Sequence, residues 1–371
     1  MSIRSALGIR SVSRVLIVGA AVALAMSTGL ASAQPSRSPG WRVVYRNAED
    51  SFLAVTATAS NNAWAAGFTR TSQPFVRHWN GRSWGSATLP TGVGGKFGGF
   101  LQVLAGSSAS NAWAFGEDFG VPGPTVISVV LRWDGKRWSQ LTTPLGNVVI
   151  GGAAVFSAAD VWVFGCPDRA GDPGAGTWHY NGRHWTPLRL GNDDICSGSA
   201  LSSRDIWATG VNLVAGGTFI THWNGTRWSH VKTPPVTLSD GKRHTFLASS
   251  VQAISDRNVW AFGNASIDSS EGLFGGVLHW NGHSWRQVSL PGAITAVLNS
   301  ASDGQGGLWV TAHYTTGAGP ELHFTGGRWV QVALPRVSGQ AVALNGLALV
   351  PHTTSVWGVS ANSHVILKDG P

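Results

Sequence analysis

Histidine and tryptophan recur together around an Asn-Gly or Asp-Gly turn, and both residue types could do chemistry there. The first copy, HWNGRSW, spans residues 78–84, and similar stretches end at Trp138, Trp185, Trp228, Trp285 and Trp329. An imidazole could ligate a metal ion, and an indole could stack on a sugar ring. Because the pattern is repeated along the whole chain, we predict that it is a structural unit and not an active site. Five histidines hold the same place in it, where the other two units have Arg132 and Leu367, and they should lie apart around a ring, without a shared metal: His78, His179, His222, His279 and His323.

The acidic residues gather instead in stretches that depart from the repeat. Two carboxylates within a few ångströms, with roles divided by their environments, could make a secreted carbohydrate-active hydrolase or lyase. The same loops, with aromatic residues such as Phe97, Phe119 and Phe274, could recognise a glycan or a protein without catalysis. We favour binding, and whether the chain is an enzyme stays open. The candidate ligand-binding residues are Asp118, Asp168, Asp193, Asp194, His244, His313 and Tyr314.

The elements that must position these residues are predicted by a second motif, first seen as NAWAAG around Trp64. Its tryptophan returns about every 50 residues, at Trp113, Trp162, Trp207, Trp260, Trp309 and Trp357. Each unit reads as four short strands, A to D, and the Asn-Gly or Asp-Gly turn joins strands C and D as a hairpin. A period of this length with several strands per unit is typical of a β-propeller. We predict an all-β, seven-bladed propeller of four-stranded antiparallel blades.

The two ends of the chain complete this count. The last unit stops at ILKDGP and has no strand D, whereas the segment GWRVVY, residues 40–45, looks like a strand D without a unit. We therefore predict that the N-terminal strand closes the last blade, which removes an exposed sheet edge. In such a ring the A–B and C–D turns emerge on one face, and the B–C and D–A loops emerge on the other. The candidate residues belong to the second face, at the mouth of the central tunnel.

The two motifs together resemble secreted bacterial tryptophan-rich β-propeller proteins with tandem D-V-W-A-x-G and H-W-N-G-x-x-W units. The resemblance covers nearly all of the chain after the N-terminal segment and implies the propeller fold, but it implies no particular ligand. The N-G-x-x-W hairpin is also distantly similar to the Asp-box turn of sialidase-like propellers. The usual Ser and Asp of that box are not both present here, so the similarity does not imply shared chemistry.

The first 33 residues predict export. Three arginines precede an apolar run, residues 15–26, and Ala31-Ser32-Ala33 forms a small-residue cleavage site, so residues 1–33 read as a secretory signal peptide. We expect residues 34–371 to form one propeller domain that is secreted as a monomer, without a membrane span. Its partner would be an extracellular glycan or protein.

The net charge and the cysteine content limit which other functions are expected. The formal net charge of +8 includes the three arginines of the leader, and a charge this modest does not favour a nucleic acid partner. No cofactor and no metal site is expected. The two cysteines, Cys166 and Cys196, fall near the same face in neighbouring blades, and in an exported protein they predict a disulfide.

Overall fold

A computed structural model describes residues 40–119, 126–146, 148–167, 176–188, 190–237, 241–265, 274–292, 294–314 and 317–371. The predicted signal peptide and Asp168 lie outside these residues. Residues 38–371 form one compact unit. None of the described residues belongs to a helix long and apolar enough to span a membrane.

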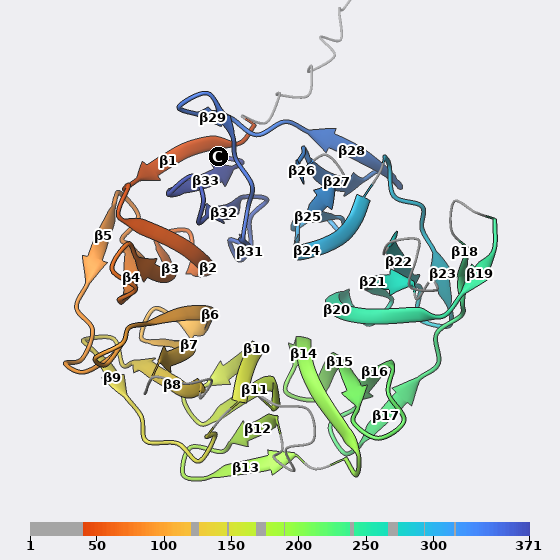
Figure 1. Ribbon diagram of the computed structural model, residues 1–371, viewed down its shortest axis with the longest axis horizontal. Helices are drawn as coiled ribbons and strands as arrows, with labels where there is room; N and C mark the ends of the chain where they lie inside the picture. Colours follow the sequence, from red (N-terminus) through yellow and green to blue (C-terminus); the bar gives the residue numbers. More distant parts are fainter. Residues whose placement is uncertain are drawn as a thin grey trace, which may run out of the picture. The chain divides into compact units, whose positions relative to one another are not determined.

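The described residues form the predicted propeller of seven antiparallel blades around a central opening (Figure 1). Blades 1 to 3 consist of β2 (Asp50–Ala59), β3 (Asn62–Thr69), β4 (Pro74–Trp79) and β5 (Trp84–Ala87); β6 (Gly99–Ser108), β7 (Asn111–Phe119), β8 (Val126–Trp133) and β9 (Trp138–Gln140); and β10 (Val148–Ser157), β11 (Asp160–Pro167), β12 (Thr177–Tyr180) and β13 (Trp185–Leu188). Blades 4 to 6 consist of β14 (Asp193–Ser202), β15 (Asp205–Asn212), β16 (Thr218–Trp223) and β17 (Trp228–Val231); β20 (Phe246–Ser255), β21 (Asn258–Ala265), β22 (Phe274–Trp280) and β23 (Trp285–Gln287); and β24 (Ile294–Ser302), β25 (Leu308–Tyr314), β27 (Glu321–Thr325) and β28 (Arg328–Val332).

Blade 7 is closed by the N-terminal strand, as predicted. Its strands are β31 (Gly346–Leu349), β32 (Val356–Ser360), β33 (Val365–Asp369) and β1 (Arg42–Arg46), and β1 pairs antiparallel with β33. Short strands decorate the connections: β26 (Gly317–Ala318) pairs with β25, while β18 (Val236–Thr237) pairs with β19 (Arg243–His244), and β29 (Arg336–Val337) with β30 (Gln340–Ala341).

A buried ion pair in blade 1 lies next to the closing strand. Arg77 in β4 donates from Nε and Nη2 to the two carboxylate oxygens of Asp50, at 2.7 and 2.8 Å. Asp50 follows β1 by a short turn and is 1% exposed. The Arg77 guanidinium also lies 5.9 Å from the ring centroid of Tyr45 in β1. The ion pair lies within blade 1, between β2 and β4, and the contact of Arg77 with Tyr45 joins that blade to the strand that completes the last one.

The core is divided into seven aromatic clusters, one at each interface between blades. In each interface the tryptophan of strand B packs against the first aromatic residue of strand D in the next blade. Trp64 lies 5.2 Å from Trp138, and the last interface repeats this geometry, with Trp357 lying 5.1 Å from Trp84. Indoles of this size supply the large apolar area that flat sheets need in order to pack face to face. The tryptophans of the repeat therefore hold the ring together.

The repeated histidines serve the same purpose. Each stacks on the strand B tryptophan of its own blade, as His78 does on Trp64 at 3.9 Å and His323 on Trp309 at 4.1 Å. The Nε2 atom of each bonds to an Asp or Asn at the start of strand B or in the turn before it; the partners are Asn62, Asp160, Asp205, Asn258 and Asp303. Each of these five imidazoles therefore lies in a different blade. Within the described residues no three His, Cys, Asp or Glu side chains gather as a metal site.

In two blades a cation takes the place of the imidazole. Arg132 lies 5.6 Å from the ring of Trp113, and Lys368 lies 5.5 Å from the ring of Trp357. The motif alignment of the sequence assigns this position in blade 7 to Leu367, and that assignment is wrong by one residue, because Trp357 pairs with Lys368. No C–D hairpin holds β33 in register, since its partner β1 comes from the other end of the chain.

The two faces of the ring are defined by its connections. The A–B and C–D turns lie together, since the indole of Trp79 beside the C–D turn donates to the carbonyl of Ser60 in the A–B turn at 3.0 Å. We call this the turn face; in blade 1 it comprises residues 60–61 and 80–83. The opposite face carries the B–C and D–A connections, residues 70–73 and 88–98 in blade 1, and we call it the loop face.

Candidate functional site

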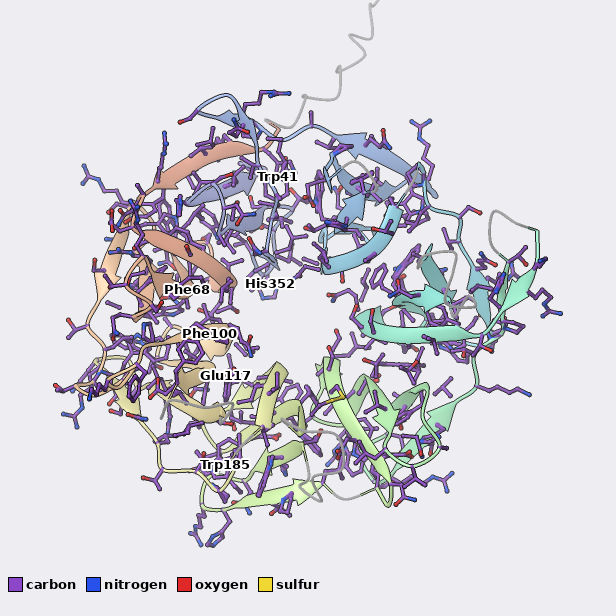
Figure 2. All side chains as sticks on the ribbon, viewed as in Figure 1. Trp41, Phe68, Phe100, Glu117, Trp185 and His352 are labelled. Carbon is purple, nitrogen blue, oxygen red and sulfur yellow. A yellow bond between two sulfur atoms is a disulfide. The ribbon has the colours of Figure 1, made fainter. Side chains whose placement is uncertain are left out.

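A cavity of about 420 Å³ opens on the loop face between blades 1 and 2. We call it the loop-face hollow, and its lining is mostly apolar: Leu53, Phe68, Ser72, Gly99, Phe100, Gln102 and Phe119. Figure 2 places Phe68 and Phe100 next to each other across these two blades, with Glu117 beyond them. A concave site with aromatic walls and few polar groups is the usual form of a binding pocket.

The three phenylalanines reach the hollow because they stand at strand ends, where inter-blade packing stops. Phe68 lies near the end of β3, Phe100 near the start of β6, and Phe119 at the end of β7. The rings of Phe100 and Phe119 are 5.7 Å apart and tilted by 57°. Phe119 is 39% exposed, although the interior of the same strand is fully buried. The hollow therefore presents apolar surface that the fold itself does not cover.

The rim of the hollow depends on a close approach of two loops. Gly99 donates its backbone N–H to the carbonyl of Ser72 at 2.8 Å. Gly98 has a φ of +89°, and a Cβ at this position would stand 2.4 Å from the Ser72 carbonyl oxygen. Only glycine fits that conformation and spacing without strain. The glycine-rich segment before β6 thus lets the D–A loop of blade 1 pack against its B–C loop.

Gln102 connects the hollow to the centre of the ring. It is the extra residue of a β-bulge in β6, and its amide nitrogen donates to Glu117 Oε1 and to the carbonyl of Ile150, both at 3.0 Å. Both amide hydrogens are therefore occupied, which leaves its carbonyl oxygen as an acceptor. Leu53 and Gln102 also line a cavity of about 210 Å³ between the innermost strands. The hollow thus adjoins the central opening.

Asp118, one of the predicted site residues, supports this hollow from behind. Its Oδ1 accepts the backbone N–H of Gly94 at 2.8 Å. Burial raises the pKa of Asp118, and the hydrogen bond from Gly94 opposes that shift. Its carboxylate holds the long loop between β5 and β6 in place.

Asp193 and Asp194 begin β14 in blade 4, away from this hollow. Asp193 accepts a hydrogen bond from Asn212 at 2.6 Å, and its other carboxylate oxygen lies 2.9 Å from Nε2 of His230. Asp194 is 6% exposed; burial raises its pKa, and the hydrogen bond from the backbone of Gly176 opposes this. Adjacent residues of a strand point to opposite faces of the sheet. The carboxylates of Asp193 and Asp194 therefore do not point toward a common substrate.

The remaining predicted residues lie farther round the ring. His244 is in β19, before blade 5, and His313 and Tyr314 end β25 in blade 6. His313 is exposed and its Nδ1 lies 3.2 Å from the Thr295 hydroxyl. Tyr314 is buried and donates its hydroxyl to the carbonyl of Pro320 at 2.7 Å. Burial raises the pKa of Tyr314 to about 12, and the nearby Glu321 adds to the shift.

The disulfide prediction is confirmed. Cys166 near the end of β11 and Cys196 in β14 are bonded, with their Cα atoms 4.8 Å apart. Cys196 is the extra residue of a β-bulge, as Gln102 is two blades earlier. The bond therefore ties blade 3 to the innermost strand of blade 4.

Sequence reasoning found only part of the loop-face hollow. It singled out Phe119 and Asp118, and it missed Phe68, Phe100 and Gln102. The missed residues follow the repeat, so they read as ordinary core positions. A usable signal was the length of the β5–β6 connection and its glycines, which keep these strand ends from being covered.

Known proteins show this fold at low sequence identity. No protein-family description matches the chain, and no curated protein matches it. Among solved structures, YCF48 bound to D1 peptide is 13% identical with a TM-score of 0.58, covering 90% of this chain and 97% of that one. YCF48 from Cyanidioschyzon merolae is 16% identical with a TM-score of 0.59, covering 90% and 99%. The β-propeller domain of Cps50 (Swd1) from Myceliophteria thermophila is 9% identical with a TM-score of 0.53, covering 88% and 98%. At these identities the likeness establishes the propeller and nothing finer.

Proposed function

We propose that this protein is a binding module whose loop face docks a segment of another protein, with an apolar side chain of that segment in the loop-face hollow. The observation that carries this proposal is the lining of the hollow, where Leu53 and three phenylalanines face only two polar side chains. A glycan presents many hydroxyls that need partners. An aliphatic or aromatic side chain needs apolar surface, which the hollow offers.

The distribution of exposed apolar residues supports a partner on this face. Nine large apolar side chains are exposed among the described residues, and six of them stand in loop-face connections or strand ends: Phe97, Phe119, Ile127, Val149, Leu213 and Val214. Apolar side chains that collect on one face mark a docking surface better than scattered ones do. The first four belong to blade 2 or to its immediate neighbours, and Phe119 among them lines the hollow.

The other predicted residues fit a partner of macromolecular size. His244 precedes blade 5 and His313 ends a strand of blade 6, which Figure 1 shows across the central opening from blade 2, while Asp193 begins blade 4, two blades along the ring. Only a ligand that crosses the mouth of the ring would meet these residues and the hollow together. The propeller of YCF48 has been solved with a peptide, so the fold is compatible with such a ligand.

We also propose that the partner is extracellular. The support is the leader pattern of residues 1–33, together with a disulfide of the kind that persists in oxidising compartments. Mass mapping of protein from culture fluid tests export, with Gln34 as the expected first residue. A retained Met1 would contradict it.

The docking proposal is tested with a peptide of known sequence. Peptides selected on the purified protein from a displayed random library are synthesised, and their dissociation constants are measured by calorimetry. Phe119→Ser removes an exposed ring and should weaken binding about 10-fold or more, the equivalent of ~1.4 kcal/mol or more of lost apolar contact. Val43→Ser, an equally exposed apolar change on the outer strand of blade 7, is the control and should change nothing.

Three outcomes would count against docking. Equal affinities of the wild-type and Phe119→Ser proteins would move the site away from the hollow. A glycan whose strong binding is abolished by Phe119→Ser, when no peptide is selected, would replace the protein partner by a glycan. Turnover of a glycan, abolished by changing one loop-face carboxylate, would make the protein a hydrolase or lyase.

A further inference from the structure

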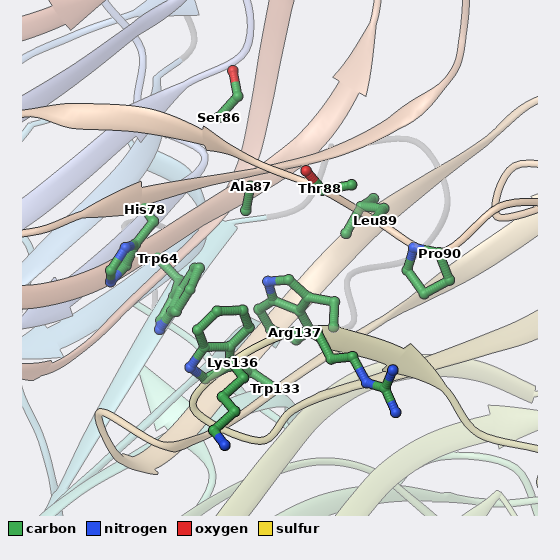
Figure 3. A pocket seen from close by; sticks show the side chains of 11 residues that line it. Trp64, His78, Ser86, Ala87, Thr88, Leu89, Pro90, Trp133, Lys136 and Arg137 are labelled. Carbon is green, nitrogen blue, oxygen red and sulfur yellow. The ribbon is translucent and has the colours of Figure 1, made fainter.

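A second cavity, of about 340 Å³, lies at the same blade interface on the side of the turn face (Figure 3). We call it the turn-face hollow. The residues that matter for its chemistry are Trp64, His78, Pro90, Trp133, Lys136 and Arg137. It shares no lining residue with the loop-face hollow. A ligand bound in the turn-face hollow is therefore independent of the function proposed above.

The inner wall of the turn-face hollow is aromatic and rigid. Trp133 lies 5.0 Å from the buried Trp64, and its indole nitrogen donates to the carbonyl of Ala109 at 3.0 Å. Because that N–H is already bonded, the partly exposed Trp133 offers a ligand only its ring. A fixed indole ring suits the C–H face of a sugar, which loses little conformational freedom on stacking.

His78 adds to this wall without adding charge. Its Nε2 is bonded to Asn62 at 2.7 Å, and its ring stacks on Trp64. Burial lowers the pKa of His78, so the imidazole is neutral at neutral pH. The wall of the hollow is therefore uncharged.

The charge comes from the C–D turn of blade 2. Lys136 and Arg137 are exposed neighbours there, and Figure 3 shows both side chains extending from the turn beside Trp133. Their backbone N–H groups donate to Asp134 Oδ1 at 2.8 and 2.9 Å, and these bonds, that from Arg137 first, lower the pKa of Asp134. Two cations and one carboxylate leave one positive charge in excess. In the Asn-Gly turns of the other blades no Lys stands beside Arg at the corresponding positions; they hold one Arg, one His, or Arg183 beside His184.

We propose that the turn-face hollow binds a sugar residue that carries one carboxylate, a uronic acid unit of an acidic polysaccharide. The sugar ring stacks on Trp133, with Pro90 on the far side of the hollow, and the carboxylate is held by Arg137 and Lys136. Charge-assisted hydrogen bonds from a guanidinium fit a carboxylate in two-point geometry. The volume of the hollow lies within the range of small-ligand sites, ~300–1,000 Å³. A single excess charge matches a monoanionic unit better than a polyphosphate.

Calorimetry on the whole protein tests this with short oligosaccharides of galacturonate, mannuronate and glucuronate. We expect at least one of them to bind. Its methyl ester, which has the same shape without the charge, should lose affinity by about 10-fold or more. Arg137→Ala should cause a similar loss of affinity. Added salt should lower the affinity of the wild-type protein toward that of the variant. Arg82→Ala, in the equivalent turn of blade 1, and Phe119→Ser, in the loop-face hollow, should bind as the wild type does.

The proposal is overturned if none of the three acids binds at millimolar concentration. It is also overturned if acid and ester bind equally, or if Arg82→Ala weakens binding as much as Arg137→Ala. Tighter binding of a sulfated neutral oligosaccharide than of every uronate would show that the site does not select carboxylates.

Discussion

Glu321 gives the structure its clearest dependence on pH. Its side chain lies in β27 inside blade 6, is 2% exposed, and accepts a hydrogen bond from the Thr311 hydroxyl at 2.9 Å. Burial raises the pKa of Glu321 from 4.5 to about 8, and the bond from Thr311 only partly opposes this. The group is thus a neutral acid in the folded protein at pH 7.

The direction of the effect is set by proton binding. Between pH 4.5 and about 8 the folded protein holds the proton of Glu321 and the unfolded chain does not. The contribution of this group to stability is complete below pH 4.5 and is lost as pH rises to about 8. At ~1.36 kcal/mol for each pH unit, the loss in the free energy of unfolding is on the order of 4–5 kcal/mol.

Glu321→Gln should remove this dependence. Glutamine has the shape of the protonated acid and keeps an oxygen for Thr311, but it does not ionise. Urea denaturation from pH 5 to pH 9 gives the difference in unfolding free energy between variant and wild type, in which the other titrating groups cancel. The unfolding free energy of the variant, relative to that of the wild type, should increase by several kcal/mol in total as pH rises to about 8.

The control is Glu49→Gln, since the side chain of Glu49 is 63% exposed and its nitrogen partner on Arg70 is 3.8 Å away. Its difference from wild type should stay flat over the same range. A flat difference for Glu321→Gln would refute the reasoning, because it would mean that the buried carboxyl ionises in the folded protein without cost.

Three further changes test the closure by β1, the buried ion pair of blade 1 and the disulfide between blades 3 and 4. Deleting residues 34–46 removes β1 and Trp41, and because a lost core tryptophan alone costs about 3–5 kcal/mol, the melting temperature should fall; an unchanged value would contradict closure by β1. Asp50→Asn breaks the buried pair with Arg77 and should cost about 3–5 kcal/mol in urea denaturation, whereas a neutral result would mean that Arg77 reaches solvent. Replacing Cys166 and Cys196 by serine removes a disulfide between residues 30 positions apart and should lower the unfolding free energy by about 3–4 kcal/mol. The reduced wild type should have the same unfolding free energy as the variant, and a difference between them would point to an effect of the serines.

The repeat made the ring predictable from the sequence, because the same turn and strand motifs recur from blade to blade. The Asn-Gly turns fix the C–D hairpins, the tryptophans mark strands B and D, and the unmatched ends required closure by β1. Prediction was wrong by one residue at Leu367, where β33 lacks the hairpin that sets register in the other blades. It missed Phe68 and Gln102 as site residues, because a cavity depends on which strand ends two neighbouring blades leave uncovered.

The two hollows lie at the two ends of the β5–β6 connection, where β5 ends and β6 begins. Ser86 to Pro90 line the turn-face hollow, and Gly99 and Phe100 line the loop-face hollow. The connections before blades 5 and 7 are also long, but they fold into short hairpins of their own, β18–β19 and β29–β30. The β5–β6 connection has no strand, and its glycines at 92, 94, 95 and 98 adopt positive φ. The turn-face hollow combines this connection with repeat residues, since Thr88, Leu89 and Pro90 line it together with Trp133, Lys136 and Arg137. Recognition at this interface therefore needs both the segment that departs from the repeat and the side chains of the repeated turn.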